Sequence, residues 1–150
     1  MIKTLEHSSK KVATEIHAVF RLSYKIEAQL VGVEDFPPLF RTVEHIQSAI
    51  SRFIGLWIDS ELAAVTEYTH NETHLSIDSL AVHPSFFRRG LASQLVQFLL
   101  DSVDWRSADV ETAVANNPAI TLYEKFGFSE VRRWKTTEGI DKIQLTHERL

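Results

Sequence analysis

Apolar residues recur three or four positions apart in several stretches of the chain, the spacing typical of helices. In the longest stretch, the pair Ser8-Ser9 offers an N-cap and Gly32 a C-terminal stop. Thr42 is a suitable N-cap for the second stretch. Pro118 can start the last stretch, because a helix needs no amide hydrogen in its first turn. This periodicity predicts four helices, at residues 11–30, 42–51, 91–103 and 118–127.

Between these stretches the apolar period shortens and β-forming residues dominate. The pattern predicts strands at residues 2–6, 53–58, 62–68, 75–82, 109–114, 128–134 and 140–145. Strict alternation in the strand 75–82 would place Leu75, Ile77, Ser79 and Ala81 on one face. Asp78 and Leu80 would then lie on the other face.

The predicted elements follow the order β-αα-βββ-α-β-α-ββ, with no internal repeat and no linker-like segment. Such a mixed order indicates one sheet with helices on its faces, the α+β or mixed α/β class. The length of 150 residues fits a single domain over residues 1–150.

Composition narrows the function classes. Hydrophobic residues make up 44% of the chain and charged residues 24%, as in ordinary globular proteins, and the net charge of −4 gives no basic field for nucleic acid. No apolar run approaches the roughly 20 residues that cross a bilayer, and no cysteine is present. We therefore expect a soluble, cytoplasmic protein without nucleic-acid or membrane partners. His70 and His74 flank a turn without a carboxylate in register, so no metal site is predicted.

The segment from His83 to Ser93 joins a predicted strand to a predicted helix through Arg88, Arg89 and Gly90. The first amides of a helix have no intrahelical partner, and the helix dipole adds positive charge there. The segment therefore predicts a phosphate or pyrophosphate site, with Gly90 allowing close approach of the backbone. The alternative interpretation is a solvated basic turn before a core helix.

Two motifs resemble those of the GNAT superfamily of acetyl-CoA-dependent N-acetyltransferases. In the first, Gly90 and Ala92 match the fourth and sixth places of the family's Q/R-x-x-G-x-G/A motif, while Phe87 departs from its first place. The second, running from Asn116 to Phe128, is similar throughout to N-x-x-A-x-x-L-Y-x-x-x-G-F. The resemblance covers the C-terminal two-thirds well, and residues 1–52 match only as a β-α-α pattern.

The resemblance implies a GNAT-like, mostly antiparallel sheet of about seven strands flanked by four helices. It also implies acetyl-CoA as co-substrate, with the pantetheine arm paired to a strand edge and the pyrophosphate held mainly by backbone amides. The cofactor-binding residues expected on this basis are Leu80, Ala81, Val82, Arg88, Arg89, Gly90, Leu91, Ala92, Ser93, Asn116 and Tyr123.

The implied activity is transfer of the acetyl group to a primary amine of a small molecule, an amino acid or a peptide. Tyr123 matches the family tyrosine that protonates the CoA thiolate. Glu111 stands where some ribosomal-protein acetyltransferases place a catalytic glutamate, and Asp78 is a second candidate base. A water chain without a single base remains an alternative, as does a non-catalytic acyl-CoA sensor or partner-binding domain on the same scaffold. The expected assembly is a monomer or homodimer.

Overall fold

The computed structural model describes residues 1–149. Its strands are β1 (Ile2–Leu5), β2 (Arg52–Ile58), β3 (Glu61–Asn71), β4 (His74–Val82), β5 (Ser107–Ala113), β6 (Ser129–Lys135) and β7 (Asp141–Glu148). Its helices are α1 (Lys10–Val31), α2 (Val43–Ser48), α3 (Leu91–Ser102) and α4 (Asn117–Lys125), with short 3₁₀ turns at Pro37–Phe40 and Pro84–Phe86.

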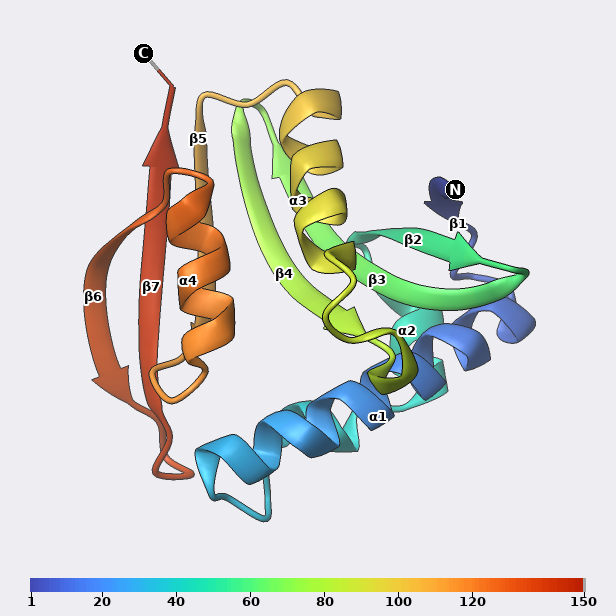
Figure 1. The fold of residues 1–150 in the computed structure, drawn as a ribbon, viewed down its shortest axis with the longest axis horizontal. Coiled ribbons are helices and arrows are strands. Elements are labelled where there is room, and N and C mark those ends of the chain that lie inside the picture. Colours follow the sequence, from blue (N-terminus) through green and yellow to red (C-terminus); the bar gives the residue numbers. More distant parts are fainter. Residues whose placement is uncertain (150) are drawn as a thin grey trace.

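Over the described residues, the strands form one seven-stranded sheet in the order β1-β2-β3-β4-β5-β7-β6. Only β4 and β5 run parallel; the other neighbours are antiparallel. Helices α3 and α4 cover one face, and α1 packs against β3 and β4 on the other (Figure 1). This arrangement confirms the fold class and element order expected from the sequence.

Each face of the sheet has its own apolar core. The first core includes Leu95, Leu99 and Val110 beneath α3 and α4. The second includes Ile16, Phe20 and Phe53 beneath α1. The amphipathic helices predicted from the sequence thus bury their apolar faces on opposite sides of the sheet.

The pairing between β4 and β5 covers only half of β4. Their register runs from His74↔Ser107 to Ile77↔Val110 and ends there. Beyond that point the two strands diverge toward α1 (Figure 1). Residues 78–82 of β4 therefore present a strand edge to the space between β4 and β5, because their pairing to β3 uses only the other edge.

A β-bulge at Asp78 overturns the strict alternation expected along β4. Glu67 pairs with Ser79 and the next residue of β3, Tyr68, pairs with Ile77, so Asp78 is the extra residue. As a result Ile77 lies in the α3–α4 core, whereas Ala81 lies in the α1 core. The sequence prediction was wrong here because a bulge shifts every later side chain to the opposite face.

The predicted helix ends are confirmed at three positions. The Ser9 hydroxyl accepts the Val12 amide, Thr42 accepts the His45 amide, and Gly32 ends α1 with φ of 77°. The second helix is shorter than predicted: it stops at Ser48 because Ala49 turns to extended backbone before β2. No helix within residues 1–149 is long and apolar enough to cross a bilayer.

Candidate active site

The turn that enters α3 is built to expose backbone amides. Arg88 and Gly90 both adopt left-handed backbone conformations, with φ of 64° and 73°. Gly90 is the N-cap of α3 and supplies no side-chain cap, so the first amides of the helix lack that partner. A Cβ added at Gly90 would meet no described heavy atom within 4 Å, so space is open on that side. This geometry fits the predicted anion site.

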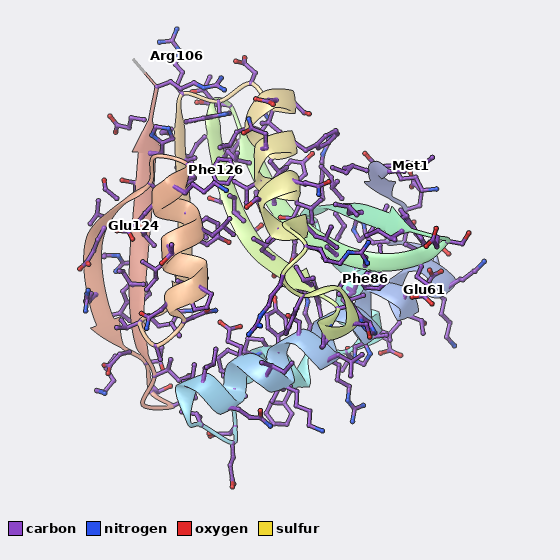
Figure 2. The ribbon with its side chains drawn as sticks, in the orientation of Figure 1. Met1, Glu61, Phe86, Arg106, Glu124 and Phe126 are labelled. Carbon is purple, nitrogen blue, oxygen red and sulfur yellow. The ribbon has the colours of Figure 1, made fainter. Side chains whose placement is uncertain are left out.

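Three cations surround this turn, of which the sequence analysis named two. Arg88 and Arg89 are exposed, and the Arg89 guanidinium lies 5.4 Å from the centre of the Phe86 ring. Phe86 lies in the segment between β4 and α3 (Figure 2). From α4, Lys125 Nζ donates to Ser93 Oγ at 3.4 Å. Only the packing of α4 beside α3 brings Lys125 there, so no local sequence signal could have placed it.

Tyr123 lies in the α3–α4 core and is only 3% exposed. Its ring packs edge-on against Phe128, with 5.8 Å between centroids. Burial raises the pKa of the Tyr123 hydroxyl, and the nearby Tyr24 and Glu27 raise it further. Tyr24 and Glu27 belong to α1 on the opposite face of the sheet, so their influence on Tyr123 acts between the two helix layers. A tyrosine in this state stays protonated and can donate.

Asn116 connects the two layers at the same place. Its Oδ1 accepts the Ala119 amide at 3.3 Å, which caps α4, and its Nδ2 donates to Glu27 Oε1 at 2.9 Å. Burial raises the pKa of Glu27, although the hydrogen bond from Asn116 and the charge of Lys142 each lower it in part. The side chain predicted to meet the cofactor is thus engaged with α1 and α4 in this structure, and Glu27 is a carboxylate that the sequence analysis missed.

Asp78, a candidate base, projects from the bulge of β4 and is exposed. Thr69 Oγ1 donates to its Oδ2 at 2.5 Å. Partial desolvation raises the pKa of Asp78; Thr69 opposes this shift, and the neighbouring carboxylates of Glu67 and Asp109 reinforce it. A carboxylate with a raised pKa is a better proton acceptor than an ordinary one.

Glu111, the other candidate base, is the first residue of β5 beyond its pairing with β4. Its side chain is 42% exposed and lies 3.9 Å from Arg132 of β6. Arg132 Nε also donates to Gln144, which in turn donates to Asp109 on β5. Glu111 therefore sits at the edge of a polar network, and the structure does not bring it into hydrogen-bonding contact with Asp78 within the described residues.

Glu67 is the most enclosed carboxylate of this region, and the sequence analysis missed it. It is 5% exposed and accepts hydrogen bonds from Arg41, Ser51 and Ser79. Burial alone would raise the pKa of Glu67, but the hydrogen bonds from Arg41 and Ser51 lower it below its ordinary value. A polar residue inside the apolar run 61–68 was the only available signal.

A pocket of about 430 Å³ opens beside this cluster. Its lining includes Tyr24, Pro38, Phe40, Arg41, Asp78 and Ser79. The rigid Pro37–Phe40 turn supplies one wall, and the bulged part of β4 supplies another. Because residues 78–82 also edge the space between β4 and β5, the pocket lies next to the strand edge expected to pair with the pantetheine arm.

Comparisons with known proteins match most of the chain, including part of the N-terminal third. The family model described as "Acetyltransferase (GNAT) family" matches residues 15–128. UPF0157 protein YqkA of Bacillus subtilis is 36% identical over 141 residues, which are 93% of this chain and 41% of that protein. The [Ribosomal protein bS18]-alanine N-acetyltransferase of Salmonella typhimurium is 36% identical over 95 residues, covering 57% of this chain and 63% of the relative. The chain thus spans only about half the length of these curated relatives.

Solved structures share the whole fold at lower identity. The ribosomal-protein-S18-alanine N-acetyltransferase of Escherichia coli superposes with a TM-score of 0.77 and 20% identity, covering 99% of this chain and 92% of that one. The PaiA N-acetyltransferase of Thermoplasma acidophilum, solved with coenzyme A, gives a TM-score of 0.76 and 14% identity, covering 99% of this chain and 98% of that one. With the family model matching most of its length, the chain belongs to the GNAT acetyltransferase family.

Proposed function

We propose that this protein transfers the acetyl group of acetyl-CoA to a primary amine. The observation that carries the proposal is the separation of β4 from β5 after Ile77 and Val110, which leaves the edge of residues 78–82 free for a ligand. The chain thus offers an exposed strand edge, an uncapped helix N-terminus and a buried phenol. Those are the parts that binding and cleaving a thioester of CoA require.

Acetyl-CoA would be held by the chain as follows. The amides of the turn from Arg88 to Ser93 bind the pyrophosphate, with Arg88, Arg89 and Lys125 adding charge. The free edge of β4, at Leu80, Ala81 and Val82, pairs with the amides of the pantetheine arm. Asn116 has two alternative roles. Its side chain either leaves Glu27 and binds the pantetheine arm, or it keeps its present hydrogen bonds as the cap of α4. The fit rests on the open space at Gly90.

The reaction needs one proton acceptor and one donor. An ammonium substrate first loses a proton, and the free amine attacks the thioester carbonyl. The new C–N bond forms as the C–S bond breaks, the nitrogen gives its second proton to the base, which has passed the first to solvent, and the departing thiolate takes a proton from Tyr123, whose phenolate is then reprotonated from the base. We assign the base to Glu111, which is exposed beside the gap, and the acid to Tyr123, which burial keeps protonated.

The acceptor class follows partly from the relatives. Five relatives carry names that specify alanine of a ribosomal protein as their acceptor. An amine next to a carbonyl group is therefore one acceptor to test for this chain, together with small amines and amino acids. Cytoplasmic location and a monomeric or homodimeric state stay predictions from the sequence.

The test is release of CoA thiol from acetyl-CoA in the presence of an amine panel that includes small amines, amino acids, polyamines and peptides. We expect turnover with at least one class, and Tyr123→Phe should lower kcat about 100-fold while acetyl-CoA affinity stays the same. Tight binding of acetyl-CoA without turnover on any amine would contradict the proposal and favour a non-catalytic acyl-CoA sensor. Equal losses of kcat and affinity in Tyr123→Phe would remove Tyr123 as the acid.

A further inference from the structure

Arg41 faces the pocket with much of its hydrogen-bonding capacity unused. Its Nη1 and Nη2 each donate to Glu67, at 2.6 and 3.0 Å. A guanidinium has five N–H groups, and two of them donate to acceptors within residues 1–149, so about three remain for a ligand. The guanidinium is packed over the rings of Phe20 and Phe53, at 5.8 and 5.7 Å, which fixes its plane. Its side chain is 26% exposed, so a ligand in the pocket can reach it.

Asp78 lines the same pocket with an acceptor to spare. Thr69 occupies Oδ2, while Oδ1 receives no hydrogen bond within residues 1–149. Arg41 and Asp78 influence each other's charge, yet no ion pair of 4.0 Å or less joins them in the described chain. The pocket therefore holds a cationic donor and an anionic acceptor that are near one another but separated.

Two opposite charges held apart in one pocket complement a ligand that carries the reverse arrangement. We propose that the acceptor is an amine with a carboxylate or carbonyl group beside it, read by Arg41, while its ammonium group binds Asp78. This inference rests on the proposed acetyl transfer and names its substrate class. Tyr24, Pro38 and Phe40 form the apolar part of the pocket, which fits an apolar side chain on that acceptor.

Glu67 serves this recognition without touching the ligand. With its two oxygens taken up by Arg41, Ser51 and Ser79, it holds the guanidinium in one orientation. A bidentate, pre-oriented arginine binds planar carboxylates and carbonyls better than a flexible lysine. Glu67 is accordingly a positioning residue and Arg41 a specificity-determining residue.

The experiment compares three ligands that share one side chain: leucine, leucine amide and 3-methylbutylamine. Their affinities are measured by calorimetry on the protein saturated with CoA, which carries no acetyl group to transfer. Leucine or leucine amide should bind at least about tenfold more tightly than 3-methylbutylamine, since each adds an oxygen that accepts a charge-assisted hydrogen bond from Arg41. Preference for leucine identifies a free amino acid as acceptor, and preference for the amide identifies a peptide N-terminus.

The matched variant is Arg41→Met combined with Glu67→Gln, which removes both charges and keeps an acceptor oxygen for one of the two serines, Ser51 and Ser79, that donate to Glu67. The preference should vanish in this variant and persist in Arg106→Gln, whose arginine lies at the end of the molecule opposite α1 (Figure 2). Equal affinities for all three ligands in the wild-type protein would overturn the inference, as would a preference that survives the double change. Acetylation of amines without this preference would leave the proposed function intact, whereas the preference without any acetylation would contradict that function alone.

Discussion

The guanidinium of Arg41 holds the carboxylate of Glu67 through two hydrogen bonds, Nη1 to Oε1 at 2.6 Å and Nη2 to Oε2 at 3.0 Å. Arg41 follows the proline turn after α1, and Glu67 lies inside β3, so the pair joins the pocket wall to the sheet. Arg41→Met should destabilise the protein by about 3 kcal/mol, because it leaves a buried carboxylate unpaired. The free energy of unfolding from urea denaturation measures this loss.

The double variant Arg41→Met/Glu67→Gln is the control for that measurement. It should recover most of the lost stability, because no unpaired charge remains buried. A double variant no more stable than Arg41→Met would show that the packing of Arg41 over Phe20 and Phe53, rather than the pair, accounts for the effect.

Lowering the pH should weaken the contribution of Glu67 to the free energy of unfolding. The folded protein holds the pKa of Glu67 below its ordinary value, since the hydrogen bonds from Arg41 and Ser51 outweigh burial. Its contribution is therefore complete above the unfolded value of about 4.3 and is lost as the pH falls through the lower folded value. The stability difference between wild type and Glu67→Gln should shrink as the pH falls from about 6 to about 3. If the free energies of unfolding of the two proteins change in parallel over this pH range, the lowered pKa of Glu67 is contradicted.

The anion site predicts a sharp contrast between two glycines. Gly90 and Gly139 both have positive φ, 73° and 84°, and open space where a Cβ would stand. Valine at either position should cost stability, on the order of 1–2 kcal/mol, from backbone strain. Only Gly90→Val should also weaken acetyl-CoA binding, by about tenfold or more, because its side chain enters the space assigned to the pyrophosphate. If calorimetry gives both variants the wild-type affinity for acetyl-CoA, the assignment of the pyrophosphate to this turn is contradicted.

Substitutions of the two carboxylates beside the gap, Glu111 and Asp78, should change different kinetic parameters. Glu111→Gln should lower kcat about 100-fold if Glu111 is the base. Asp78→Asn should mainly raise KM for the acceptor, because Asp78 binds the ammonium group. Glu61→Gln, at an exposed turn of β3, is the neutral control. A large loss of kcat in Asp78→Asn alone would make Asp78 the base, and small losses in both would favour a water chain.

Local chemistry made much of the fold predictable. The caps at Ser9 and Thr42 and the stop at Gly32 follow from backbone preferences that each residue carries by itself. The turn around Gly90 was equally readable, because a positive φ before an apolar helix favours glycine. These features depend on neighbours in sequence, so their prediction needed no tertiary information.

The features that the sequence analysis missed depend on partners far along the chain. The bulge at Asp78 is defined by its register with Glu67 and Tyr68 on another strand. Glu67 is a charged residue in an apolar strand, and its burial becomes tolerable only with Arg41, 26 positions earlier. Glu27 meets Asn116 across 89 positions. Such pairings have no local pattern, which is why the acceptor pocket could not be derived from residues 1–52.

The most direct test of the account follows the acetyl group itself. The protein is incubated with acetyl-CoA labelled in the acetyl group and with leucine, leucine amide and 3-methylbutylamine, and mass spectrometry locates the label. The account predicts that the label appears on the amine nitrogen of the acceptor, in step with release of CoA thiol, and that Tyr123→Phe slows both together. Label that stays on CoA, or that appears only as free acetate, would contradict it.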